Sequence, residues 1–205
     1  MLKIKNLSIN LRQPLFYDFT YNFLPSSIYG LIATNGKGKT SFFRAIMNLI
    51  PKESGSVCIN EKDISASKQS IFYFESSNWF DLNVSGLDYL KLIKQEWNSS
   101  KDIQSMIDYW DMSDYIRLPI RKYSLGMKQK LLLSLYQISN ADYLLFDEPT
   151  NALDEGARKK FFSLINQLRE EEKTIILSSH YKEDILNICD FLLTIDNVRI
   201  EAMKV

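Results

Sequence analysis

The stretch Tyr29-Gly-Leu-Ile-Ala-Thr-Asn-Gly-Lys-Gly-Lys-Thr-Ser41 decides the fold of this chain. It begins within an apolar run, 28–33, that predicts a strand, and it continues into a glycine-rich turn at 35–38. In the residues that follow, 40–50, apolar side chains recur at helical spacing: Phe42, Ile46, Leu49 and Ile50. We therefore expect a strand, a loop and a helix, with Pro51 ending the helix.

A strand, a glycine-rich loop and a helix are what a phosphate-binding loop requires, because backbone N–H groups at a helix N-terminus form a cradle for polyphosphate. Lys39 is expected to reach the β- and γ-phosphates of a nucleotide, and the Thr40 hydroxyl to face Mg²⁺. The usual pattern has glycine where this chain has Ala33, which costs little only if φ there is negative. Short Gly/Lys patterns also mark ordinary surface turns. The predicted binding residues are Ala33, Thr34, Asn35, Gly36, Lys37, Gly38, Lys39, Thr40 and Ser41.

Composition limits the class of protein. The chain has 205 residues, of which 45% are hydrophobic, so it can bury a substantial core. Lys+Arg and Asp+Glu balance at 25 each, which gives no support for binding to nucleic acid. No apolar run approaches the roughly 18 residues of a membrane span, and the N-terminus does not read as a signal peptide. Cys58 and Cys189 lack metal-ligand spacing, so we expect a reduced, cytoplasmic protein.

The order of patterns along the chain predicts the fold class. Residues 1–30 alternate as strands do, residues of about 76–136 show helical patterns without strand signals, and strands and helices then alternate again. We expect a single α/β domain over 1–205, with a mainly parallel sheet, an N-terminal antiparallel β subdomain and an inserted α-helical subdomain at about 76–136. Further strands are expected at 57–59, 71–74, 143–146, 174–177 and 191–195, and helices at 84–95, 103–110, 157–168 and 183–189.

Two carboxylates follow the apolar strand 143–146, at the sheet edge where open α/β sheets bind ligands. Asp147 is placed to hold Mg²⁺ opposite Thr40. Glu148 is placed to act as general base on a water in line with the γ-phosphate. A solvated Asp-Glu turn is the alternative. His180, the only histidine of the chain, follows the strand 174–177. A single histidine at a strand end is more often structural, but its place at the edge of Asp147 favours a catalytic role.

The segment Ser124-Leu-Gly-Met-Lys-Gln129 opens an apolar helix, with Ser124 as a credible N-cap. Together with the phosphate loop, Leu145-Phe-Asp-Glu-Pro-Thr150, Asn151-Ala-Leu-Asp154 and Ser178-Ser-His180, it resembles the ATP-binding subunits of ABC transporters, with a P-loop NTPase core, over essentially the whole chain. The Ser-Leu-Gly-Met form most resembles subunits of bacterial exporters of peptides, bacteriocins and antibiotics. The resemblance implies an ATPase that powers export through a separate permease, at the inner face of the cell membrane.

The resemblance also implies partners and roles for individual residues. Two ATP-binding subunits, in a homodimer or heterodimer, would enclose two ATP molecules. Ser124 and the Gly126 N–H of one subunit would meet the γ-phosphate held by Lys39 of the other. His180 would contact the γ-phosphate and orient the attacking water. The helical subdomain would face the permease, and Trp79 and Phe80 are expected to line a groove for one of its helices. The alternative for these two aromatic residues is packing inside the subdomain.

The chain departs from the family pattern in its phosphate loop, its helix-opening segment and its base-binding region. Glu75 stands where many members have glutamine; its carboxylate is a candidate Mg²⁺ ligand that would also repel the γ-phosphate. No aromatic residue lies near Asn10 or Leu11 to stack on adenine, and Phe16 or Tyr17 are possible substitutes. Two alternatives stay open: a degenerate nucleotide-binding regulatory subunit, and a soluble ABC ATPase without a transport role. The remaining departures are Ala33 for Gly, Thr34 for Pro and Leu125 for Gly.

Overall fold

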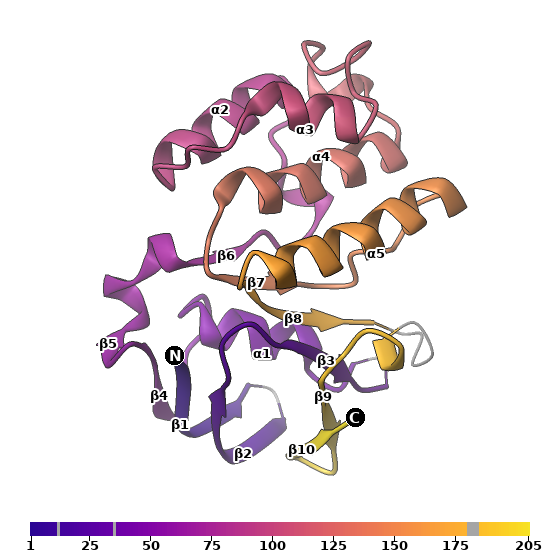
Figure 1. The fold of residues 1–205 in the computed structure, drawn as a ribbon. Helices are drawn as coiled ribbons and strands as arrows, with labels where there is room; N and C mark the ends of the chain where they lie inside the picture. Colours follow the sequence, from indigo (N-terminus) through magenta and orange to yellow (C-terminus); the bar gives the residue numbers. More distant parts are fainter. Residues whose placement is uncertain (12, 35, 180–184) are drawn as a thin grey trace.

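The computed structural model describes residues 1–11, 13–34, 36–179 and 185–205 (Figure 1). These residues form two sheets and five α-helices. The first sheet has the order β2-β1-β4-β5, with β1 Leu2–Asn10, β2 Pro14–Phe23, β4 Ser54–Ile59 and β5 Lys62–Asp63. The second has the order β10-β9-β3-β8-β7-β6, with β3 Ile28–Ile32, β6 Ile71–Tyr73, β7 Tyr143–Phe146, β8 Thr174–Ser178, β9 Phe191–Asp196 and β10 Arg199–Lys204. The helices are α1 Lys39–Ile46, α2 Gly86–Glu96, α3 Ile103–Tyr109, α4 Leu125–Ser139 and α5 Glu155–Glu170.

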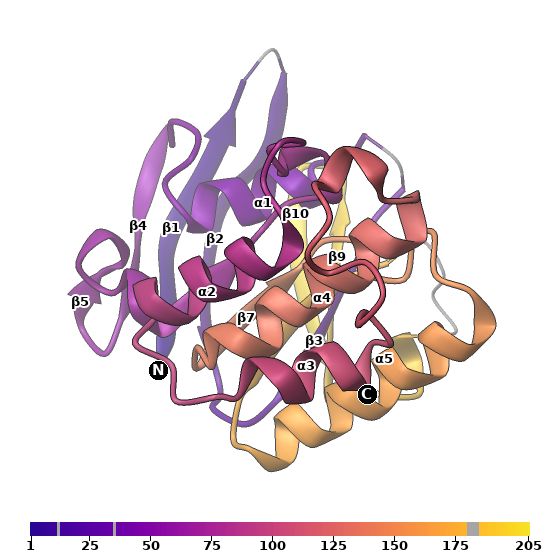
Figure 2. The same ribbon diagram turned by 90° about the horizontal axis from the view of Figure 1, so that it is seen from above.

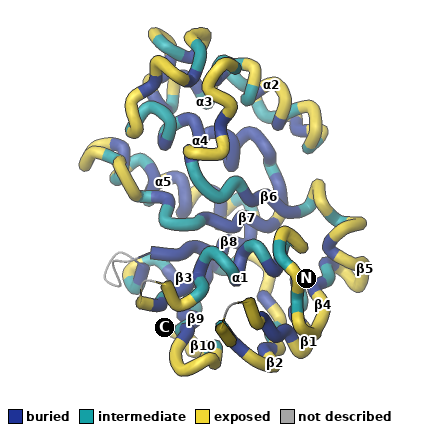
Figure 3. The backbone as a smooth tube through the Cα atoms, turned by 180° about the vertical axis from the view of Figure 1, so that it is seen from behind, coloured by how far each residue is buried: buried dark blue, intermediate teal, exposed yellow. Residues whose placement is uncertain are grey.

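The second sheet is parallel from β9 to β6, and β10 is its antiparallel edge. Its strands β7 and β8 are buried throughout because both faces are covered, as a parallel sheet requires (Figure 3). Alternate residues of one strand serve different cores. In β7, Leu144 packs with α4 and α5, whereas Leu145 packs with α1 and the first sheet. The predicted mainly parallel sheet is confirmed, and it separates two hydrophobic cores.

The first sheet is fully antiparallel, and β1 pairs with both β2 and β4. Helix α1 lies between this sheet and the parallel one. Phe42 makes edge-on ring contacts with Phe16 and Phe19, with ring centroids 5.8 Å apart in each case. These aromatic contacts hold the start of α1 in place from the side opposite to its loop. The N-terminal antiparallel subdomain is therefore also the support of the phosphate loop.

The helices α2 and α3 and the start of α4 form a layer over the core that contains Leu144 (Figure 2). Helix α4 runs on from this layer to the parallel sheet, and its residues from Leu131 to Ser139 are buried. No strand occurs between Tyr73 and Tyr143, as the sequence predicted. Phe80 corrects one prediction, because its side chain is 4% exposed and packs against Phe74 and Tyr89 in the core. Trp79, in contrast, is 44% exposed.

The first helix ends earlier than the sequence predicted. Helix α1 stops at Ile46, and Asn48 takes a left-handed conformation with φ 55°. The N–H of Leu49 donates to the carbonyl of Arg44, and that of Asn48 to the carbonyl of Ala45. This pattern ends helices wherever a left-handed residue is available. Leu49 is consequently exposed instead of continuing the apolar face. The helix expected at 183–189 lies partly outside the described residues.

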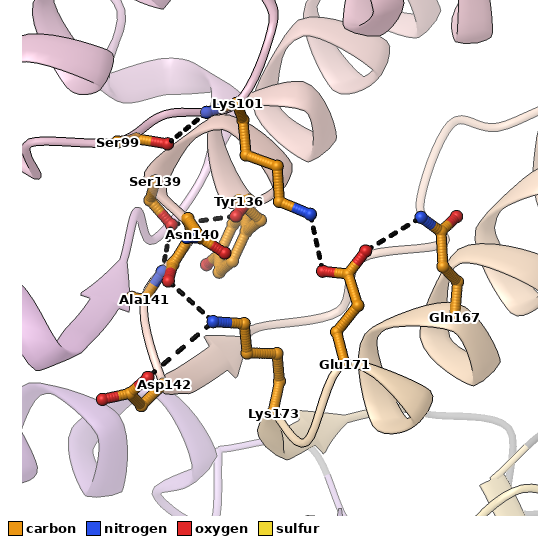
Figure 4. A network of polar contacts seen from close by, with 10 residues as sticks. All are labelled: Ser99, Lys101, Tyr136, Ser139, Asn140, Ala141, Asp142, Gln167, Glu171 and Lys173. Atoms are coloured by element: carbon orange, nitrogen blue, oxygen red, sulfur yellow. Dashed lines mark hydrogen bonds and ion pairs between the residues drawn. The ribbon is translucent and has the colours of Figure 1, made fainter.

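A polar network fastens the helical layer to the core beneath it (Figure 4). Lys101, between α2 and α3, donates to Glu171 at the end of α5 over 2.7 Å, and Gln167 donates to the other oxygen of Glu171. Lys173 donates to the carbonyl of Asn140, at the end of α4. Three connections far apart in sequence thus meet at one place. None of the helices in the described ranges is long and apolar enough to cross a membrane.

Candidate functional site

The phosphate loop lies between β3 and α1, as predicted. Gly36 and Gly38 have φ of 77° and 100°, values that glycine adopts at little cost. Ala33 is buried and is not among the residues with positive φ, so the missing first glycine carries no backbone strain. Thr34 is exposed, and its carbonyl accepts from the Lys37 N–H. Gly36 and Lys37 are exposed, Ser41 is half-buried in the first turn of α1, and Asn35 lies outside the described residues.

Lys39 begins α1 and is buried, with 6% exposure. Its Nζ donates to the carbonyl of Ala33 over 3.0 Å and lies 3.8 Å from Oε1 of Glu148. The first intrahelical bond runs from the N–H of Phe42 to the carbonyl of Gly38. The N–H groups of the preceding turn therefore have no partner within the helix. No acidic residue stands in that turn, so the helix start and the Lys39 ammonium together suit an anion.

Asp147 follows β7 and is held by two hydroxyl groups. Thr40 Oγ1 and Ser178 Oγ each donate to one of its carboxylate oxygens, both over 2.6 Å. Burial raises the pKa of Asp147, and the nearby carboxylates of Glu148 and Glu75 raise it as well. The two hydrogen bonds from the hydroxyl groups lower the same pKa but do not outweigh burial. A cation at this carboxylate would relieve that cost. The predicted pair of Thr40 and Asp147 is thus brought together.

Glu148 has a left-handed backbone, with φ 50°, which is uncommon for a residue other than glycine. Its N–H donates to Ser178 Oγ, and Asn151 Nδ2 donates to its Oε2, each over 3.0 Å. With Lys39 near Oε1, the carboxylate is fixed on both sides. Strained backbone held by its surroundings is typical of functional positions. Asn151 and Ser178 are site residues that sequence reasoning missed, although both stand within motifs that the sequence analysis singled out.

A cavity of about 300 Å³ opens beside these residues. Its lining includes Thr40, Glu75, Asp147, Glu148, Gln129 and Asn151. Within the described part of the chain, no three His, Cys, Asp or Glu side chains come together in a way that could hold a metal ion. Mg²⁺ is commonly bound by one or two carboxylates with phosphate oxygens and water completing its shell. Thr40 and Asp147 fit that kind of site.

Glu75 lies in the same cavity, but its carboxylate is already engaged. Arg44 Nε and Nη2 each donate to one of its oxygens over 2.5 Å, and the Tyr73 hydroxyl donates over 3.2 Å. Coordination of Mg²⁺ by Glu75 therefore stays a prediction that requires Arg44 to move. Sequence reasoning missed Arg44, because its partner Glu75 lies 31 residues away in the chain.

The helix-opening segment lies at a different cavity. Ser124 caps α4 by accepting from the Met127 N–H, as predicted. Ser124 and Gly126 line a cavity of about 190 Å³ together with Asp154 and neighbouring residues. A side chain at Gly126 would meet the Ala152 carbonyl at 3.3 Å, a close approach that favours glycine. Within one chain these two residues do not line the cavity of Asp147. His180 lies outside the described residues.

The predicted substitutes for an adenine-stacking aromatic residue are elsewhere. Phe16 is fully buried in the core between the two sheets, so it cannot stack on a base. Tyr17 is exposed and lines a groove between β2 and β10. The cavity next to the phosphate loop, of about 460 Å³, is instead lined by aliphatic and polar groups. They include Pro14, Leu15, Gly36, Lys37 and Val198.

Comparisons with known proteins agree with this geometry. Residues 16–151 match the ABC transporter family. The uncharacterized ABC transporter ATP-binding protein YybJ of Bacillus subtilis is 33% identical over the whole chain and 96% of its own length. The lantibiotic transport ATP-binding protein SrtF of Streptococcus pyogenes is 27% identical over 94% of the chain and 85% of its own length.

A solved structure of an ATP-binding subunit of an ABC transporter has the same fold, with a TM-score of 0.90. It covers all of this chain and 90% of the other at 19% identity. The shared fold therefore extends over the full length of this chain and most of the other. Members of the family are ATPases that bind ATP, generally with Mg²⁺, and that typically pair with a membrane permease and dimerise. This chain belongs to the ATP-binding proteins of the ABC transporter family.

Proposed function

We propose that this chain binds ATP with Mg²⁺ and hydrolyses it to power export of a peptide or antibiotic-like substrate through a separate permease chain. The observation that carries the proposal is the fixed carboxylate of Glu148, beside Asp147 and 3.8 Å from the Lys39 ammonium. A regulatory subunit that only binds nucleotide has no need of a strained, fixed base. The proposed substrate class rests on the similarity to SrtF, a lantibiotic transport ATP-binding protein.

In the proposed mechanism, Lys39 and the first N–H groups of α1 bind and orient the phosphates. Thr40 and Asp147 would hold Mg²⁺, which would neutralise negative charge on the phosphates when bound. Glu148 accepts the proton of the attacking water, and Asn151 keeps its carboxylate turned toward the cavity. His180 is proposed to contact the γ-phosphate and help orient that water. Adenine is proposed to lie against Leu15 and Val198, so that aliphatic contacts take the place of ring stacking.

The proposed assembly has two ATP-binding subunits on the cytoplasmic side of the membrane. Ser124 and the Gly126 N–H of one subunit complete the phosphate site of the other. The support is that Ser124 and Gly126 line a different cavity from that of Asp147, although their neighbour Leu125 lines the cavity of Asp147. The permease is proposed to bind the helical layer, where Trp79 and Leu82 leave apolar surface exposed.

The decisive variant is Glu148→Gln. It removes the base and one negative charge while keeping shape, so ATP turnover should fall by about 10²–10⁴ with ATP binding retained. Light scattering should then find a dimer with Mg-ATP and a monomer with ADP. Glu96→Gln, on the exposed face of α2, is the matched control and should keep full turnover. Wild-type protein that binds ATP without turnover would instead indicate a regulatory subunit, and loss of ATP binding in Glu148→Gln would contradict its role as a base.

A further inference from the structure

Three carboxylates gather around the cavity at the phosphate loop: Glu75, Asp147 and Glu148. Asp147 is paired with hydroxyl groups, and Glu148 lies near Lys39. Glu75 is 13% exposed at its side chain and receives both arms of the Arg44 guanidinium. A carboxylate so far removed from water needs a partner, because burial disfavours its charged form.

The geometry of this pair is specific. Arg44 lies on α1, one helical turn beyond the Mg²⁺-facing Thr40, and Glu75 follows β6 directly. Two parallel N–H···O bonds between guanidinium and carboxylate fix orientation as well as charge, which a lysine at this place cannot do. Burial raises the pKa of the Tyr73 hydroxyl, so it keeps its proton and donates to the same carboxylate. Glu75 is thus held by three donors from two elements.

The consequence concerns the third phosphate. In the proposed function, Lys39 reaches the β- and γ-phosphates and Glu148 faces the γ-phosphate. Glu148 and Glu75 line the same cavity, so the negative charge that a triphosphate adds would lie nearer to Glu75 than the phosphates of a diphosphate would. An unpaired Glu75 would repel that added charge across a partly buried site, where charges interact more strongly than in water. When Glu75 is paired with Arg44, the net charge of the pair is zero, so the repulsion of the added phosphate is removed.

We propose that Arg44 is a positioning residue that neutralises Glu75 and thereby allows the site to bind a nucleoside triphosphate in preference to a diphosphate. The inference rests on the proposed function and deepens it, by naming what compensates for the charge of Glu75 at the phosphate site. The competing explanation is that the pair only ties α1 to the end of β6.

Calorimetric titration of the full chain with Mg-ATP and with Mg-ADP separates these explanations. In Arg44→Gln, ATP affinity should fall about tenfold while ADP affinity changes less than about twofold, because the repulsion acts on the γ-phosphate. In the double variant Arg44→Gln/Glu75→Gln, ATP affinity should recover. Lys160→Gln, which breaks an ion pair with Asp111 at the surface, is the matched control and should leave both affinities unchanged.

Equal losses for ATP and ADP in Arg44→Gln, or no recovery in the double variant, would overturn the inference and leave a structural tie. A loss of ATP affinity in Glu75→Gln alone, with Arg44→Gln unaffected, would also overturn it and assign Glu75 to the metal. Thermal melting of each variant without nucleotide identifies any variant that fails to fold. Failure of the proposed function gives a different result, since wild-type protein would then bind no ATP or bind it without turnover, whereas failure of this inference leaves ATP binding and turnover of the wild-type protein intact.

Discussion

The phosphate-loop end of the sheet and the start of α4 both offer groups suited to phosphate, yet they are built differently. At the first, Lys39 and Asp147 are buried or half-buried and bonded to other parts of the same chain. At the second, Ser124 bonds only to its own helix start among the contacts described, and Leu125 beside it is 58% exposed. The first region is organised within one chain, whereas the second presents its groups outward. In the proposed dimer, a single chain would therefore complete the phosphate-loop half of the shared site and leave the other half to its partner.

The largest effect is expected when the Lys39 ammonium is removed from the phosphate-loop end of the sheet. Lys39→Ala loses charge-assisted contacts to phosphate worth about 1.5–3 kcal/mol each, so ATP affinity should fall at least tenfold. Lys91→Ala is the matched control, since that lysine is exposed on α2 and lies outside the phosphate loop. Calorimetry on the isolated chain measures both. Unchanged affinity in Lys39→Ala would mean that the loop is no phosphate site.

A smaller effect is expected from the outward-facing half. Ser124→Ala should leave ATP affinity of the isolated chain unchanged but weaken the ATP-bound dimer about three- to tenfold, because the lost hydrogen bond crosses between subunits. Light scattering in a Glu148→Gln background measures the dimer. Ser85→Ala removes the equivalent cap of α2, at a similar cost of about 0.5–2 kcal/mol, and should keep the dimer. Equal weakening by both variants would reduce Ser124 to a helix cap.

The smallest expected effect is on stability, and it depends on pH. Burial raises the pKa of Asp147 above its ordinary value of 3.8, so the folded chain binds this proton more tightly than the unfolded chain does. The free energy of unfolding that Asp147 contributes therefore falls as pH rises from 3.8 through the pKa of Asp147 in the folded chain. Asp147→Asn should melt a few degrees higher than wild type at pH 7 without Mg²⁺, and the gain should vanish as pH falls toward 3.8. A lower melting temperature at pH 7 would show that the carboxylate stabilises the metal-free fold.

Local chemistry explains which features the sequence could predict. The loop before α1 and the carboxylates after β7 follow from apolar strands that end in glycine or acidic residues, so neighbours in the chain suffice. The pairing of Arg44 with Glu75 joins residues 31 apart in sequence. It depends on how α1 lies against β6, which no local pattern contains. Ser178 was missed as a partner of Asp147 for the same reason.

Two predictions, the length of helix α1 and the position of Phe80, were wrong because of local features of the chain. Helix α1 was expected to continue because Leu49 fits the helical spacing, but Asn48 accepts a left-handed backbone and ends the helix first. Trp79 and Phe80 were treated alike because their apolar character is alike. Phe80 follows the short helical turn Ser77–Trp79 and points into the core, while its neighbour stays at the surface. Adjacent residues on such a turn face different directions, and composition cannot tell them apart.

The hydroxyl of Ser178 restricts how this chain can vary. It is fully buried, gives its single proton to Asp147 and accepts the N–H of Glu148, so it has no proton left to donate elsewhere. Alanine or valine here would remove one hydrogen bond from Asp147 and one from Glu148 at the same time. Threonine keeps the hydroxyl but must fit a methyl group into close-packed surroundings. A single inherited change at β8 would thus alter the surroundings of the proposed metal ligand and of the proposed base together.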